Sequence, residues 1–168
     1  IAALVAFETM KRRSAEAGIK FILLAALASG TSLFGVSLLY ASTGTVYFQE
    51  MAALLSYSSL SITGFIFFFA GIAFKISLVP FHFWTADVYE GAPIGITSYL
   101  SVISKGAAVT ILTIILFTVM QSFQEVIHIL LYIVALASMF IGNLFALRQK
   151  NMKRFLAFSS IAQAGFIL

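Results

Sequence analysis

The sequence contains no cysteine and only two prolines, and charged residues make up just 10% of it. Without cysteine the chain forms no disulfide, no zinc–thiolate site and no iron–sulfur cluster with cysteine ligands. The glycine motifs of nucleotide-binding loops and a Ser/His/Asp arrangement are also absent. We therefore expect any redox chemistry connected with this chain to take place in a partner protein.

Apolar residues dominate what is present. They make up 61% of the sequence, and the mean hydropathy is +1.06. A soluble domain carries about a quarter charged residues, so this apolar excess must face lipid or other apolar helices. Four segments reach the roughly 20 residues that a membrane-spanning helix needs: Phe21–Ala41, Ile62–Trp84, Ile94–Met120 and Val126–Leu147. The predicted fold class is therefore all-α, a multi-pass membrane helix bundle.

Shorter apolar runs precede Lys11 and follow Arg154. We expect them to belong to two further helices, and the chain to be a fragment of a longer protein. Residues 1–168 would then form part of one membrane-embedded domain with no internal boundary. The net charge of +4 does not predict a nucleic acid partner, because no arginine-rich face with interleaved aromatic residues accompanies it.

Lysine and arginine are distributed unevenly among the connections. If the four segments cross the membrane in turn, Lys11–Arg13, Thr85–Pro93 and Arg148–Arg154 lie on one side, and Ser42–Ser61 and Gln121–Glu125 on the other. The first and third of these carry all the Lys and Arg of the five, and the two on the opposite side carry none. Cytoplasmic loops are enriched in these residues, so the basic side is predicted to be cytoplasmic.

One connection on the basic side breaks this pattern. The segment Thr85–Pro93 contains Asp87 and Glu90 but no basic residue. We interpret it as an acidic inner loop next to a helix that carries a lysine.

Lys75 lies deep in an otherwise uncharged segment, five residues before Pro80. A charge at that depth costs from about 3 to more than 10 kcal/mol, so it faces a wet cavity or a partner. Pro80 has no N–H, so the carbonyl of Ile76 loses its helical partner and the turn is weakened. Transporters place ion sites at such mid-membrane breaks. The alternative is a lysine that snorkels to the surface, but about 14 Å of helix to Trp84 makes that difficult.

Lys105 lies near the centre of the third segment, among small residues in the run Ser101–Ala108. Small neighbours allow another helix to approach closely and allow water to enter. Burial disfavours the charged form of a lysine, which suits a proton relay. The alternative is a lysine paired with a carboxylate from a helix outside this chain.

His82 follows Lys75 at i+7, on the same face if the helix continues. We place it at the inner mouth beside Asp87 and Glu90, where an imidazole suits a proton shuttle; the alternative is a structural histidine. His128 is predicted on the opposite side of the membrane, so the two histidines do not predict a metal site.

Glu16 and Lys20 are spaced i, i+4 at the start of the first long helix, the favourable order for an ion pair. A structural pair is one interpretation. The functional alternative is that Glu16 reaches Lys75 or another site and modulates its charge. Ser138, Gly142 and Ala146 form a stripe of small residues, which predicts a helix contact.

The run Phe74–Pro93 (FKISLVPFHFWTADVYEGAP) resembles a signature of subunit N of bacterial respiratory complex I, an antiporter-like membrane subunit family. Further runs resemble the same family, so that the resemblance covers nearly the whole chain: Ser14–Lys20, Ser101–Lys105 and Asn151–Ala162.

The resemblance implies an antiporter-like fold of inverted five-helix repeats, of which this chain covers the end of helix five to the start of helix ten. It implies that Lys75 is the lysine of the broken seventh helix, paired with a glutamate of helix five, and that Lys105 is the lysine of the eighth. Both would translocate protons, with His82 and Glu16 as further candidates. NADH, FMN, iron–sulfur clusters and quinone would be bound by partner subunits, with no cofactor in this chain.

The function expected from the residues and the resemblance together is that of a proton-translocating membrane subunit of an NADH:quinone oxidoreductase. Its partners would be lipid and the other membrane subunits of complex I. Two alternatives remain at this point: a cation/proton antiporter subunit of the same superfamily without a redox partner, and a structural membrane scaffold whose lysines are neutralised by fixed ion pairs.

Overall fold

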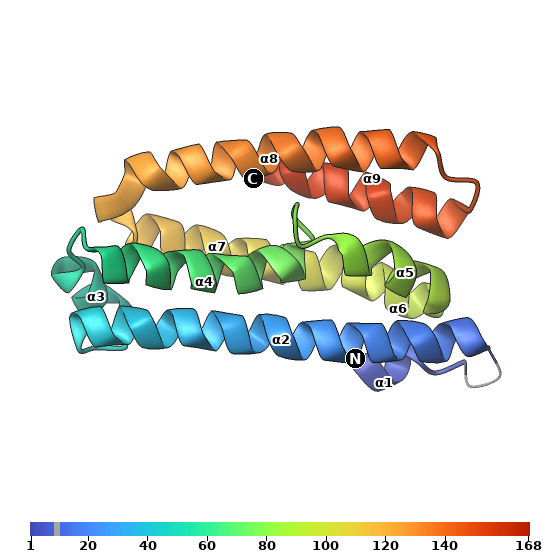
Figure 1. Ribbon diagram of the computed structural model, residues 1–168, viewed down its shortest axis with the longest axis horizontal. Coiled ribbons are helices and arrows are strands. Elements are labelled where there is room, and N and C mark those ends of the chain that lie inside the picture. The colour runs from blue at the N-terminus through green and yellow to red at the C-terminus, as the bar shows by residue number, and fades with distance from the viewer. Residues whose placement is uncertain (9–10) are drawn as a thin grey trace.

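The computed structural model describes residues 1–8 and 11–168, and these contain helices and no strand. Figure 1 shows a flat helix bundle with α2 along one edge, α8 and α9 along the other, and α4, α5 and α7 between them. The longer helices are α2 (Arg12–Thr43), α4 (Ser59–Ile76), α7 (Lys105–Thr118), α8 (Gln124–Leu147) and α9 (Met152–Ile167). The shorter elements are α1 (Ala2–Val5), α3 (Phe48–Leu54), α5 (Phe83–Gly91), α6 (Ile94–Tyr99), the π-helix η1 (Leu100–Ser104) and the 3₁₀-helix η2 (Gln121–Phe123).

Within the described residues, four helical stretches are long and apolar enough to cross a membrane: Arg12–Thr43, Ser59–Ile76, Ile94–Thr118 and Gln124–Leu147. The predicted all-α membrane bundle with four spans is therefore confirmed. Large apolar side chains remain exposed along α8, for example Ile129, Phe140 and Leu144. An exposed surface of this kind is suited to lipid or to other apolar helices.

The basic segments Lys11–Arg13 and Arg148–Arg154 lie at the same end of the bundle, as predicted (Figure 1). The connections that contain α3 and η2 lie at the opposite end. The prediction of an inner loop at Thr85–Pro93 is wrong, because most of that segment is helix α5. Its acidic residues are therefore presented by a helix.

Helix α4 ends at Ile76, so the predicted continuous segment Ile62–Trp84 is interrupted. Ser77 takes a left-handed backbone conformation with φ 67°. The N–H of Leu78 then bonds the carbonyl of Ala73 (2.9 Å) and the N–H of Ser77 that of Phe74 (3.0 Å), the Schellman pattern that ends a helix. The predicted break near Lys75 is present, and it ends the helix instead of only weakening one turn. The estimate of how deep Lys75 lies in the membrane assumed a continuous helix to Trp84, and it is therefore wrong.

Small residues set the spacing between α2 and α4. A Cβ on Gly35 would lie 2.2 Å from the backbone nitrogen of Phe68 and 2.6 Å from the carbonyl oxygen of Gly64. A Cβ on Gly71 would lie 2.7 Å from the carbonyl oxygen of Ala28. Membrane helices approach this closely only where the contact residues are small. The position of α4, and with it of Lys75, therefore depends on these glycines.

We predict that Gly35→Ala destabilises the full-length subunit. Alanine favours a helix interior over glycine by about 1 kcal/mol, but here its methyl group must push α2 and α4 apart, which costs about 1–3 kcal/mol. Gly30→Ala is the matched control in the same helix, because no atom of the described residues lies within 4 Å of its Cβ position. The unfolding temperature of the purified protein should fall for Gly35→Ala and stay level or rise for Gly30→Ala. Equal behaviour of the two variants would contradict close packing at Gly35.

Candidate functional site

Lys75 lies in the last turn of α4, one residue before the helix break. Its side chain is exposed to a cavity of about 310 Å³ whose walls come from α2, α4, η1 and α7. Among the described residues no carboxylate lies within ion-pair distance of it. The lysine therefore faces a space large enough for several waters.

Lys105 is the first residue of α7, directly after the π-helix η1. Only 6% of its surface is exposed. Its Nζ donates hydrogen bonds to the hydroxyl of Ser160 (2.7 Å) and the carbonyl of Ser160 (3.3 Å). The same atom lies 5.9 Å from the centre of the Tyr89 ring. A π-helical turn shifts the register of the side chains that follow it and is frequent at functional sites.

The two lysines face different cavities that share their walls. Lys75 and Ser104 line the 310 Å³ cavity, whereas their neighbours Ile76 and Lys105 line a second one of about 260 Å³. The end of α4 and the junction of η1 with α7 therefore separate the cavities.

Two side chains, Ser138 of α8 and Trp84 of α5 itself, hold the break between α4 and α5 in place. The hydroxyl of Ser138 on α8 accepts a hydrogen bond from the N–H of Val79 (3.0 Å) and donates one to the carbonyl of Val134 (2.7 Å). Trp84 Nε1 donates to the carbonyl of Phe74 (3.1 Å). These bonds satisfy backbone groups that a membrane interior would otherwise leave unpaired. The stripe of small residues around Ser138 is buried as a helix contact, as predicted, and Ser138 in addition anchors the break.

His82 is not at the inner mouth, and that prediction is wrong. It immediately precedes α5 at the break, is 4% exposed, and stacks on Phe83 with ring centroids 4.4 Å apart. Asp87 and Glu90 lie further along α5, toward the basic end of the bundle. Because α4 does not continue through this point, His82 and Lys75 do not share a helix face. Its role as a proton relay stays a prediction.

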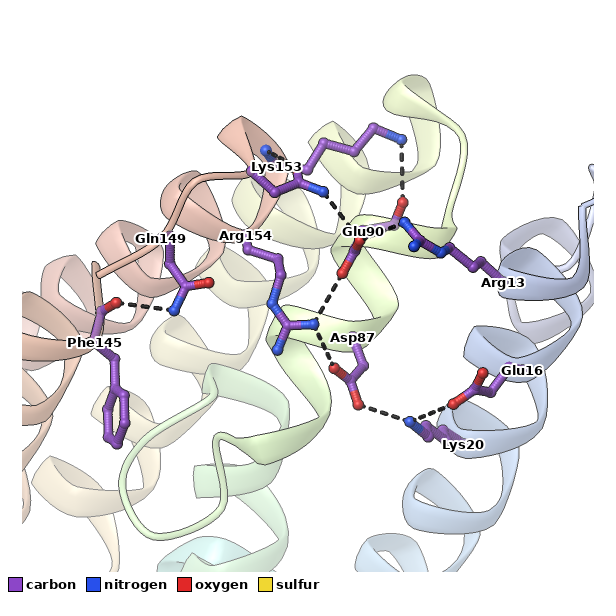
Figure 2. Close-up of polar contacts among 10 residues, drawn as sticks. Arg13, Glu16, Lys20, Asp87, Glu90, Phe145, Gln149, Lys153 and Arg154 are labelled. Carbon is purple, nitrogen blue, oxygen red and sulfur yellow. Dashed lines mark hydrogen bonds and ion pairs between the residues drawn. The ribbon is translucent and has the colours of Figure 1, made fainter. Parts of the chain in front are cut away.

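Asp87 and Glu90 join a chain of alternating charges, which we call the ion chain and which Figure 2 shows. It runs from α2 through α5 to α9 and returns through α5 to α2, in the order Glu16, Lys20, Asp87, Arg154, Glu90 and Arg13. The successive nitrogen–oxygen distances are 2.7, 2.8, 3.1, 2.9 and 3.0 Å. The acidic residues that interrupt the basic side of the sequence are thus neutralised by it.

Arg154 occupies the centre of the ion chain. One of its nitrogens contacts both Asp87 and Glu90, whose side chains are 34% and 17% exposed. Lys153 binds the carboxyl end of α5, where its Nζ donates to the carbonyls of Glu90 (3.4 Å) and Ala92 (2.9 Å). Basic side chains at the carboxyl end of a helix bond its free carbonyls in this way. The start of α9 therefore holds the end of α5.

Glu16 pairs with Lys20 as predicted, at 2.7 Å. Lys20 in turn contacts Asp87. The structure gives Glu16 no hydrogen bond or ion pair with Lys75 among the described residues. In this chain its observed partner is Lys20, at one end of the ion chain.

Among residues 1–8 and 11–168 no group of three His, Asp or Glu side chains is placed to hold a metal ion. The polar contacts of Lys105 and of the break involve Ser160, Tyr89 and Ser138, none of which the sequence analysis proposed for a site. A serine in an apolar helix is a common residue, so only the contacts in the folded structure distinguish Ser138 and Ser160 from other serines.

The comparisons with known proteins agree with this geometry. The family described as NADH:quinone oxidoreductase/Mrp antiporter, TM, matches residues 1–168. The chain belongs to this family. A relative from Azobacteroides pseudotrichonymphae genomovar. CFP2 named NADH-quinone oxidoreductase subunit N is 53% identical over 168 residues, all of this chain and 35% of that protein. This chain therefore spans about a third of its relative.

Two solved structures are similar over 98% of this chain. The membrane-bound sulfane sulfur reductase, described as an archaeal respiratory membrane complex, contains a chain with TM-score 0.86 and 32% identity, of which 34% is covered. Respiratory complex I from Thermus thermophilus contains one with TM-score 0.79 and 33% identity, of which 35% is covered. Family and helices together identify this chain as part of a multi-pass membrane protein.

We predict that Arg154→Gln destabilises the subunit, because Asp87 and Glu90 then repel each other and lose a shared donor. A hydrogen bond to a charged group contributes about 1–3 kcal/mol when partly buried. Arg148→Gln is the matched control, since Arg148 is exposed at the same end and has no ion pair in the described structure. Thermal unfolding of the purified subunit separates them. A fall of equal size for both variants would contradict a central role of Arg154.

Proposed function

We propose that residues 1–168 are part of one membrane-embedded domain of a proton-translocating subunit in an NADH:quinone oxidoreductase. Lys75 and Lys105 would carry the translocated protons. The family match over the whole chain and the 53% identity to a protein named subunit N support this proposal. NADH, FMN, iron–sulfur clusters and quinone would be bound by partner subunits, and this chain would supply one part of the proton path.

The observation that carries the proposal is the setting of the two lysines. Each lies in an apolar span beside an interruption of the helix, and each lines a cavity. Neither is neutralised by a carboxylate among the described residues. Among the described residues the ion chain at the end of the bundle holds most of the ion pairs, and the carboxylate that the resemblance predicts for Lys75 would come from outside this chain.

The free energy needed to translocate a proton by way of the two lysines is modest. Moving one charge across 100 mV requires about 2.3 kcal/mol. One pKa unit corresponds to about 1.4 kcal/mol, so a charge that approaches or leaves a buried lysine changes its proton affinity by enough to load or release a proton. In this scheme quinone reduction in partner subunits shifts a charge next to the lysines. This shift drives proton exchange between the cavities of Lys75 and Lys105.

His82 and Glu16 would have secondary roles. His82, buried at the break, would pass protons between the cavity side of α4 and the start of α5. Glu16 would act on the proton path through Lys20 and Asp87, not by direct contact with Lys75. The basic end of the bundle, which carries the ion chain, would face the cytoplasm of a bacterial inner membrane.

A cation/proton antiporter subunit is the second candidate, because the family description covers Mrp antiporters as well. It would use the same lysines and the same cavities without a redox partner. The identity to a subunit N favours the oxidoreductase. Pumping that requires NADH and quinone distinguishes the first candidate from the second, which exchanges cations in the absence of both.

The test uses Lys75→Ala and Lys105→Ala in the full-length subunit of the assembled complex. We expect assembly to persist while NADH:quinone electron transfer and proton pumping by membrane vesicles both fall at least about tenfold, the effect of roughly 1.4 kcal/mol. Lys150→Ala, an exposed lysine with no ion pair in the described structure, is the control and should keep both activities. Lysine variants that assemble and pump at the wild-type rate would contradict the proposal and support the scaffold.

A further inference from the structure

We propose that Ser160 is the positioning residue of Lys105, and that its hydroxyl keeps the amine in place through both of its protonation states. This inference rests on the proposed function, since it concerns how the proton on Lys105 is held. It assigns a role to a side chain on α9 that lies 55 residues from Lys105 in the sequence.

The contact is short and nearly enclosed. Lys105 Nζ lies 2.7 Å from the Ser160 hydroxyl and 3.3 Å from the Ser160 carbonyl, with the lysine 6% exposed. The face of Tyr89, at 5.9 Å, adds a weaker attraction for a cation. Of the described residues, Ser160 provides the only hydrogen bonds to this amine. Its side chain therefore decides where the amine sits in the cavity.

A hydroxyl suits a group that must gain and lose a proton. The ammonium form of lysine only donates hydrogen bonds, whereas the neutral amine also accepts one, and a serine hydroxyl is able to donate or accept. Ser160 can thus rotate its hydrogen and stay bonded to Lys105 in both states. A carboxylate at the same place would favour the charged form strongly and would hold the proton. The absence of an acidic group from the described surroundings of Lys105 fits a site that releases its proton.

The position of Ser160 is itself fixed by packing. A Cβ on Gly142 of α8 would lie 2.7 Å from the backbone nitrogen of Ala162, and one on Gly165 would lie 2.8 Å from the carbonyl oxygen of Ala135. Helices α8 and α9 are therefore in close contact at two positions that follow Ser160 in α9. At its start, α9 is tied through Arg154 to α5, the helix that carries Tyr89. Both contacts of Lys105 thus come from elements that are held together.

The experiment compares three variants of the full-length subunit in the assembled complex: Ser160→Ala, Ser160→Thr and Ser159→Ala. Ser159 is the matched control, a neighbouring serine on α9 with no side-chain hydrogen bond in the described structure. Rates of NADH:quinone electron transfer and proton pumping are measured per assembled complex, across a range of pH. Ser160→Ala should lower both about tenfold, as expected for one lost hydrogen bond to a charged group. Ser160→Thr, which retains the hydroxyl, should keep most of the rate, and Ser159→Ala all of it.

The pH profile separates positioning from general damage. The ionisable groups near this amine in the described structure are Tyr89 from α5 and Lys75 from α4, in the adjoining cavity. Because Ser160 contacts the amine that titrates, the ratio of the Ser160→Ala rate to the wild-type rate should change with pH. A packing defect would lower the rate by the same factor at every pH. If Ser160→Ala fails to assemble, Ser160→Cys serves in its place, because a thiol keeps the volume but is a weak hydrogen-bonding group.

Failure of this inference and failure of the proposed function look different. If Lys105→Ala is inactive while Ser160→Ala matches wild type, Ser160 does not position the amine and the proton-translocating role of Lys105 is unaffected. If Lys105→Ala is itself fully active, the proposed function is wrong and this inference falls with it. Loss in Ser160→Thr equal to that in Ser160→Ala would also overturn the inference, since the hydroxyl would then not be what matters.

Discussion

Holding the ammonium of Lys75 or Lys105 in the middle of a membrane costs several kcal/mol unless the surrounding helices supply water or polar groups. The arrangement of the surrounding helices reduces this free-energy cost. Helix α4 ends beside Lys75 and a π-helical turn precedes Lys105, so that each lysine lines a cavity. An unbroken apolar helix offers neither free space nor free backbone groups. The interruptions therefore place both lysines beside open space, and in the proposed function protons would move between the two cavities.

Interrupted helices need support from elsewhere, because half-helices as short as α5 have little stability of their own. Glycines bring α2 against α4 and α8 against α9. Ser138 and Trp84 satisfy backbone groups at the break. At the end of the bundle the ion chain fixes α5 between α2 and α9. In the sequence Arg13 and Arg154 look like a topology signal, and Asp87 and Glu90 look like an exception to it. In the structure these four charges join the Glu16–Lys20 pair in one balanced network.

The sequence predicted what depends on composition and local spacing. The four spans, the two lysines within them, the break near Lys75 and the Glu16–Lys20 pair all follow from apolar runs, isolated charges or the i, i+4 rule. It did not predict that Asp87 and Glu90 lie on a helix, that His82 lies at the break, or that Ser160 binds Lys105. Each of these depends on contacts between residues far apart in the chain, such as the 64 positions between Glu90 and Arg154. The error on His82 has a simple cause, since the i+7 spacing has meaning only along a continuous helix.

Thiol reactivity tests most directly whether water lies next to Lys75 and Lys105. This chain has no cysteine, so single cysteines are introduced into a cysteine-free full-length subunit at Gly106, which lines the Lys105 cavity, at Ala107, which lines the Lys75 cavity, and at Phe140, which is exposed on α8. A small water-soluble methanethiosulfonate reacts with the thiolate, which forms only where water is present. We predict rapid reaction at the first two positions and little at Phe140. Equal, slow reaction at all three would show dry cavities and contradict proton movement through this part of the protein.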